Sequence, residues 1–214
     1  MKYIYFFLIL IFSTHLYAGE NKIYNVNGNN YQGYWAKASD SAPLVLLVHD
    51  WDGLTDYEMK RADMLRELYK DRAKLRALMQ GGVDFATTLG GNANNLVVMG
   101  YCFGGAAVLE SARAGMIAKG FVTFHGGLET PAGQSYADTK SPIVVFHGTA
   151  DTAITMEQFA NLATELETQK VPHEMTTYGG APHAFTVFGS DRYRKDADEK
   201  SWTSFTTFLA EQTM

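Results

Sequence analysis

Residues 100–105, Gly-Tyr-Cys-Phe-Gly-Gly, constrain the fold of this chain more than any other segment. The apolar residues 96–99 before them predict a short buried strand, and residues 106–112 after them predict a helix. A Gly-x-Cys-x-Gly block between a strand and a helix is the pattern of a nucleophile elbow, a turn so tight that only tiny residues fit on both sides of its centre. The segment therefore predicts that Cys102 stands at a helix N-terminus, where orphan N–H groups favour a thiolate. The alternative is a buried cysteine that glycines flank by chance.

Strand and helix patterns alternate along most of the chain. Further strands are predicted at residues 44–48, 121–124, 143–146 and 173–178, and a hairpin at residues 22–26 and 31–35 around Asn27-Gly28. Two later helices are predicted from their apolar faces, which comprise Met156, Phe159, Leu162 and Leu166 in one and Trp202, Phe205, Phe208 and Leu209 in the other. This alternation predicts an α/β fold with a mostly parallel central sheet flanked by helices. Because no repeat or low-complexity linker appears, residues 19–214 are predicted to form a single domain.

Residues 56–89 do not follow this alternation. Thr55 and Glu58 resemble a capping box that starts a helix, and the apolar residues up to position 86 suit one helix, or two helices that meet near residues 68–70. No strand is predicted between residues 48 and 96. Since an alternating α/β chain normally returns to its sheet between helices, this stretch departs from the expected pattern.

Residues 1–18 have the pattern of a secretory signal peptide. A short positive region with Lys2 precedes the almost wholly apolar residues 4–12, and Ala18 offers a small residue for cleavage. The apolar run is too short to span a membrane, although an uncleaved anchor is the alternative. We therefore expect an exported protein, periplasmic or secreted, with no stable membrane anchor after cleavage.

Composition narrows the possible functions. The net charge of −5 and the absence of a Lys/Arg-rich block argue against a nucleic-acid partner. An exported chain commonly carries disulfides, but this chain has 1 cysteine and cannot form an internal one. Cys102 is therefore expected to be a working thiol or a buried residue. The sequence leaves the oligomeric state open.

Three residues at the ends of predicted strands form a candidate catalytic set. Cys102, Asp151 and His183 follow three different strands, in the chain order of an α/β-hydrolase. In such a set an imidazole activates the thiol, and a carboxylate orients the imidazole. The backbone N–H groups of Phe103 and Trp51 are the expected oxyanion hole.

Each of these residues also has a simpler interpretation. Asp151 could only cap the residues that follow it, and His183 could be a surface loop residue. His49, His125 and His147 also stand at strand ends, but without a metal-ligand spacing they are expected to be hydrogen-bonded loop residues rather than metal ligands. No metal and no cofactor is expected.

The chain resembles the dienelactone hydrolase family at four segments. These are residues 49–53 (His-Asp-Trp-Asp-Gly), 100–105, 147–151 (His-Gly-Thr-Ala-Asp) and 182–185 (Pro-His-Ala-Phe). The resemblance implies an α/β-hydrolase fold and a Cys102–Asp151–His183 triad that hydrolyses a small-molecule ester or lactone without a cofactor. Asp50, Asp52, Tyr101 and Arg192 are the candidate residues of the substrate pocket, and Asp50 stands where the family has a Glu. Asp50 and Asp52 could instead only cap the helix that follows them.

Two departures from the family qualify this expectation. Val187 stands where dienelactone hydrolase has a substrate-binding arginine, which argues against dienelactone itself as the substrate, although Arg192 and Arg194 lie nearby. The family also has a strand and a long loop after the position of Glu67, which this chain is predicted to lack. The alternative function is therefore a truncated relative that is catalytically impaired, or that binds or senses redox state through Cys102.

Overall fold

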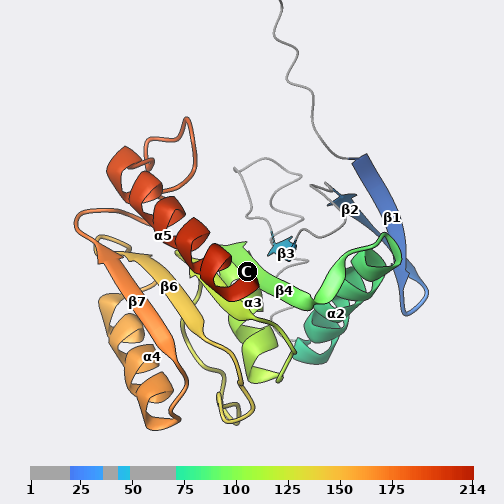
Figure 1. The fold of residues 1–214 in the computed structure, drawn as a ribbon. Helices are drawn as coiled ribbons and strands as arrows, with labels where there is room; N and C mark the ends of the chain where they lie inside the picture. Colours follow the sequence, from blue (N-terminus) through green and yellow to red (C-terminus); the bar gives the residue numbers. More distant parts are fainter. Residues whose placement is uncertain (1–19, 36–42, 49–70) are drawn as a thin grey trace, which may run out of the picture.

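The computed structural model describes residues 20–35, 43–48 and 71–214 (Figure 1). The predicted signal peptide, the predicted helix after Thr55 and three of the predicted site residues, Asp50, Trp51 and Asp52, lie outside these ranges. Among the helices that the structure describes, none has the length and apolar character needed to cross a membrane.

Within the described ranges, five parallel strands form the central sheet, in the order β3-β4-β5-β6-β7. The strands are β3 (Pro43–Val48), β4 (Asn92–Tyr101), β5 (Gly120–Phe124), β6 (Ile143–Gly148) and β7 (His173–Tyr178). Buried apolar residues fill β4, β5 and β6, because helices cover both faces of a parallel sheet. The predicted α/β fold with a parallel sheet is confirmed, and each predicted strand of this sheet is present.

The described helices lie on both faces of the sheet (Figure 1). One apolar core lies between the sheet and α2 (Arg72–Thr88), α3 (Phe103–Arg113) and α4 (Met156–Thr168), and the other lies under α5 (Lys195–Thr213). The predicted capping box starts α4, where the Thr155 side chain accepts from the Gln158 backbone N–H at 3.3 Å and the Gln158 side chain accepts from the Thr155 N–H at 2.9 Å.

Two residues of the predicted apolar helix faces are exposed. Met156 is 39% exposed because it is the first residue of α4, and Leu162 and Leu166 carry the buried face instead. Trp202 is 50% exposed, although its ring contacts that of the buried Phe205 with centroids 5.3 Å apart. Each predicted apolar face is therefore present, but it is buried only in part.

The hairpin β1 (Glu20–Val26) and β2 (Asn29–Trp35) forms a separate two-stranded sheet that packs on α2. Its turn is Asn27-Gly28, and both residues have positive φ, 51° and 82°, as a tight hairpin turn requires. Tyr24 stacks on Phe85 of α2 with ring centroids 5.4 Å apart. A Cβ at Gly81 would lie 2.4 Å from a methyl carbon of Val26, so this contact needs the glycine. Within the described residues β3 is an edge strand, and the missing neighbour stays a prediction because residues 49–70 lie outside them.

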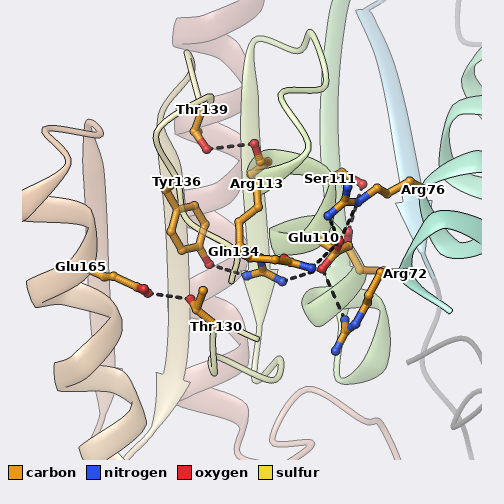
Figure 2. Close-up of polar contacts among 12 residues, drawn as sticks. Arg72, Arg76, Glu110, Ser111, Arg113, Thr130, Gln134, Tyr136, Thr139 and Glu165 are labelled. Carbon is orange, nitrogen blue, oxygen red and sulfur yellow. Dashed lines mark hydrogen bonds and ion pairs between the residues drawn. The ribbon is translucent and has the colours of Figure 1, made fainter. Parts of the chain in front are cut away.

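A charged cluster joins α2 to the C-terminal half of α3 (Figure 2). Its centre is Glu110, whose side chain is fully buried and pairs with Arg76 at 2.6 Å, Arg113 at 3.0 Å and Arg72 at 3.5 Å. Arg113 also donates to Gln134 and Tyr136, each at 2.7 Å. We call these six residues the Glu110 cluster. It fixes the far end of the helix that begins directly after Cys102.

Candidate active site

Cys102 occupies a strained turn between β4 and α3. Its φ is 50° and its ψ −115°, a conformation that non-glycine residues rarely adopt. Its N–H donates to the Phe124 carbonyl oxygen at 3.0 Å, and its own carbonyl accepts from Ala106 at 3.2 Å. A Cβ at Gly100 would lie 2.4 Å from the carbonyl carbon of Gly104, so the turn closes only with glycine at position 100. This is the geometry that the Gly-x-Cys-x-Gly pattern predicts.

The structure brings Cys102, His183 and Asp151 into one chain of hydrogen bonds, which we call the triad. His183 Nε2 lies 3.2 Å from Cys102 Sγ, and His183 Nδ1 lies 2.7 Å from Asp151 Oδ2. The His183 side chain is 20% exposed, and that of Asp151 is fully buried. The imidazole can therefore accept a proton on the thiol side while the carboxylate holds its far nitrogen.

Asp151 uses its two carboxylate oxygens for different partners. Oδ2 contacts His183, and Oδ1 accepts from the backbone N–H groups of Ala153 and Ile154, each at 2.9 Å. Burial alone would raise the pKa of Asp151, but the hydrogen bonds from His183 and the two backbone groups outweigh it and lower the pKa. The capping interpretation and the triad interpretation of this residue therefore both describe real contacts.

Of the other predicted site residues, Phe103 and Tyr101 flank Cys102 directly. Phe103 is the first residue of α3. Tyr101 ends β4, with its ring 4.6 Å from that of Phe124, and burial raises its pKa to about 12, which keeps the phenol protonated at neutral pH. Arg192 is an exposed residue before α5, and its backbone N–H donates to Ser190 Oγ. The positions of Asp50, Trp51 and Asp52 are outside the described residues.

Two of the strand-end histidines are fully buried. His125 Nε2 shares a hydrogen bond with Thr186 Oγ1 at 2.9 Å, as a hydrogen-bonded loop residue would. The His147 ring stacks on Phe159 at 5.5 Å, and burial lowers its pKa. In the part of the chain that the structure describes, no group of three His, Cys, Asp or Glu side chains is arranged to hold a metal.

Sequence reasoning missed two polar residues that the structure gives prominent contacts, Glu110 and Thr186. Glu110 is the one acidic side chain inside the predicted helix 106–112, which was the available signal for a buried ion pair. Thr186 follows His183 by three positions, but no pattern in the sequence links it to His125.

Comparison with known proteins assigns the family. The model of the dienelactone hydrolase family matches residues 55–213, about three quarters of the chain. The chain belongs to the dienelactone hydrolase family. Among solved structures, a dienelactone hydrolase-like promiscuous phosphotriesterase from metagenomic libraries has a TM-score of 0.79 at 25% identity, over 92% of this chain and 98% of that one. Esterase 2 of Thermogutta terrifontis, solved after phosphorylation by paraoxon, shares the fold at a TM-score of 0.61 and 17% identity, over 91% of this chain and 94% of that one.

A curated relative points in the same direction. A Bradyrhizobium protein named "Probable 2-oxo-3-(5-oxofuran-2-ylidene)propanoate lactonase" is 31% identical over 129 residues, which are 55% of this chain and 50% of that protein. The aligned part thus spans half the length of that lactonase. Family and fold together place the chain among hydrolases.

Proposed function

We propose that the protein hydrolyses small carboxylic esters or lactones by nucleophilic thiol catalysis, with Cys102 as nucleophile, His183 as general base and acid, and Asp151 as the residue that orients His183. The observation that carries the proposal is the continuous contact from Cys102 Sγ through His183 to Asp151, at 3.2 Å and 2.7 Å. Both distances are within the reach that proton transfer requires.

The first half of the reaction makes a thioester. His183 Nε2 takes the proton of the Cys102 thiol, and the thiolate sulfur bonds to the carbonyl carbon of the substrate while the carbonyl electron pair moves to oxygen. When this tetrahedral intermediate collapses, the bond to the alkoxy oxygen breaks, and that oxygen takes the proton from His183. For an ester the alcohol departs, whereas for a lactone it stays attached to the acyl group.

The second half of the reaction hydrolyses the thioester and regenerates the free enzyme. His183 Nε2 takes a proton from water, and the hydroxide attacks the thioester carbon. Collapse of this second intermediate breaks the carbon–sulfur bond, releases the carboxylic acid and restores the thiol and the neutral imidazole. In both halves Asp151 stays ionised, as its lowered pKa allows, and stabilises the imidazolium.

The negative oxygen of each intermediate needs hydrogen-bond donors. The proposed donors are the backbone N–H of Phe103, at the start of α3, and that of Trp51. The position of Phe103 directly after Cys102 supports the first assignment, because the residue after an elbow nucleophile supplies such a donor in α/β-hydrolases. The second assignment rests on the sequence alone.

The test is ester turnover by Cys102→Ala and Cys102→Ser on the intact chain, with p-nitrophenyl acetate and a five-membered unsaturated lactone as substrates. We expect Cys102→Ala to lose about three or more powers of ten in kcat and to keep its thermal transition. Rapid quenching of the parent should show a mass gain of one acetyl group on Cys102. Unchanged turnover in Cys102→Ala would remove this residue from the mechanism.

A non-catalytic relative is the second candidate, and the separate hairpin sheet is the observation that favours it. If the hairpin and α2 do not dock firmly on the five-stranded sheet, thermal unfolding should be broad or occur in two steps. A single cooperative transition together with ester turnover would exclude this candidate. Redox sensing through Cys102 would instead require a reversible sulfenic acid that changes the binding of a partner.

We further propose that the protein is exported. The support is the signal-like pattern of residues 1–18 and the start of β1 at Glu20, close behind the expected cleavage after Ala18. N-terminal sequencing of protein from the exported fraction should begin at residue 19, and an intact N-terminus on membrane-bound protein would favour the uncleaved anchor.

A further inference from the structure

A second imidazole, that of His125, lies against the triad and has no role in the reaction proposed above. His125 follows β5, and its side chain is fully buried. Its ring packs edge-on against that of His183, with centroids 5.2 Å apart and planes at 67°, and in the same manner against Phe185 at 5.4 Å and 75°. His125 therefore supports the triad imidazole together with the loop that carries it.

The same side chain ties that loop to the sheet. His125 Nε2 shares a 2.9 Å hydrogen bond with Thr186 Oγ1, three residues after His183. Ala184, which lies between His183 and Thr186 in the chain, has a φ of 61°, and His125 has a φ of 39°. Residues other than glycine adopt such backbone angles only where surrounding contacts hold them. The hydrogen bond from His125 to Thr186 therefore lies beside the strained backbone that follows His183.

His125 is unsuited to exchange protons with Cys102 or the substrate. Its Nε2 is engaged with Thr186, and burial, together with the nearby charge of His183, lowers its pKa to about 3. The titratable groups that face it are Tyr101, His147, Asp151 and His183. A neutral ring in this place adds no positive charge that would oppose protonation of His183. Its effect on the reaction would therefore pass through the position of His183.

We propose that His125 and Thr186 are positioning residues for His183: their hydrogen bond and the edge-on ring contact hold the imidazole in the orientation that bridges Cys102 and Asp151. This inference rests on the proposed function for its consequence in catalysis, but its geometric part concerns only the contact between thiol and imidazole. Loss of the hydrogen bond would let the loop at residues 183–186 relax, lengthening the contact from His183 to Cys102.

The test removes the hydroxyl of Thr186 without changing the size of the side chain, in Thr186→Val, and restores it in Thr186→Ser. The main measurement is the pH dependence of alkylation of Cys102, the only thiol of the chain. A thiol that contacts an imidazole at a helix N-terminus should react with a midpoint well below the ordinary value of about 8.5. In Thr186→Val we expect that midpoint to rise by about one pH unit and kcat to fall about tenfold, with little change in KM. Thr186→Ser should restore the parent behaviour.

Thr139→Val is the matched control. It deletes the hydroxyl of another threonine, which donates to the Ala112 carbonyl oxygen at 2.9 Å at the far end of α3; Thr139 is buried, whereas Thr186 is partly buried. Both valine variants should lose similar thermal stability, but only Thr186→Val should shift the alkylation midpoint. An unshifted midpoint in folded Thr186→Val, or an equal shift in Thr139→Val, would overturn the proposal.

The experiment still tests the proposal if Thr186→Val does not fold or if the parent protein hydrolyses no ester. If Thr186→Val does not fold, His125→Gln tests the same link, because it removes the edge-on ring, and an unshifted midpoint would again overturn the proposal. Alkylation needs no substrate, so the positioning role can be judged even if the parent fails to hydrolyse any ester. In that case a low parent midpoint that rises in Thr186→Val would support the positioning inference while the proposed hydrolysis fails.

Discussion

The two ends of α3 carry two polar clusters of opposite character. At the C-terminal end, the Glu110 cluster joins one fully buried carboxylate to three guanidinium groups, at contacts of 2.6–3.5 Å (Figure 2). At the N-terminal end, the triad combines a thiol, an imidazole and a carboxylate with positive φ at Cys102, His125 and Ala184. The Glu110 cluster joins opposite formal charges that lie on helices. The triad consists of groups that can exchange a proton, and strained backbone turns hold them.

This difference indicates a division of labour along one helix. Buried charges that are fully paired are costly to break, so the Glu110 cluster holds α3 against α2. Strained backbone at the triad must be maintained by its surroundings, and α3 is part of those surroundings. Changes at the triad should therefore affect reactivity with little effect on stability, and changes at the Glu110 cluster should do the reverse.

Asp151→Asn should produce the largest effect. The amide keeps an oxygen that can accept from Ala153 and Ile154, but it loses the charge that stabilises the imidazolium of His183. We expect kcat for ester hydrolysis to fall by about three to four powers of ten, with the thermal transition close to that of the parent. Steady-state kinetics and calorimetry on the same preparation measure both. A large loss of stability with small loss of rate would show that Asp151 serves mainly as a cap.

Glu110→Gln should show the reverse pattern. It leaves the buried guanidinium of Arg113, whose side chain is 2% exposed, without its counter-charge. We expect a loss of about 3–5 kcal/mol in the free energy of unfolding, measured by urea denaturation, and an unchanged kcat below the transition. Glu165→Gln is the control, because Glu165 accepts a hydrogen bond from the uncharged hydroxyl of Thr130 and the glutamine amide oxygen can still accept it, so this replacement should cost only about 1 kcal/mol. Equal losses in the two variants would contradict the view that the paired charges hold α3.

The sequence allowed the triad end of α3 to be anticipated better than the other end. The glycines around Cys102 report a steric requirement that acts within five residues, so the turn is readable locally. Asp151 and His183 could be grouped because parallel strands end at one edge of a sheet. Both inferences need only the order of elements along the chain, not their detailed packing.

The features that the sequence did not reveal depend on how elements distant in the chain pack against one another. Glu110 meets Arg76 across 34 positions and two helices, and Val26 meets Gly81 across the boundary of the hairpin. Trp202 has the correct helical spacing for a core residue, yet it is exposed. Local sequence patterns specify which face of a helix or strand is apolar, but not how much of that face the neighbouring elements cover.

Acid should weaken the Glu110 cluster gradually. Burial alone would raise the pKa of Glu110, but the hydrogen bonds and charges of Arg113 and Arg76 outweigh it, so its pKa lies below the ordinary value of 4.5. A carboxyl with a lowered folded pKa contributes stability that is complete above pH 4.5 and disappears as the pH falls through the folded pKa. The stability difference between the parent and Glu110→Gln should therefore be constant at neutral pH and shrink in acid. Urea melts from about pH 7 to about pH 3 measure it, and a difference that grows in acid would have the wrong sign.

Arg76→Ala should give the smallest effect and locate the energy within the cluster. Arg76 is the most exposed of the three arginine side chains, at 41%, compared with 21% for Arg72 and 2% for Arg113. Because water screens an ion pair of this kind, we expect a loss of about 1 kcal/mol that diminishes as salt is added, while Glu110 keeps its pair with Arg113. Arg76→Lys should recover part of that loss, since lysine keeps the charge but not the two-nitrogen contact. If Arg76→Ala instead cost as much as Glu110→Gln, the ion pair between α2 and α3 rather than the pair within α3 would supply most of the stability of the cluster, and both variants should then also shift the alkylation midpoint of Cys102.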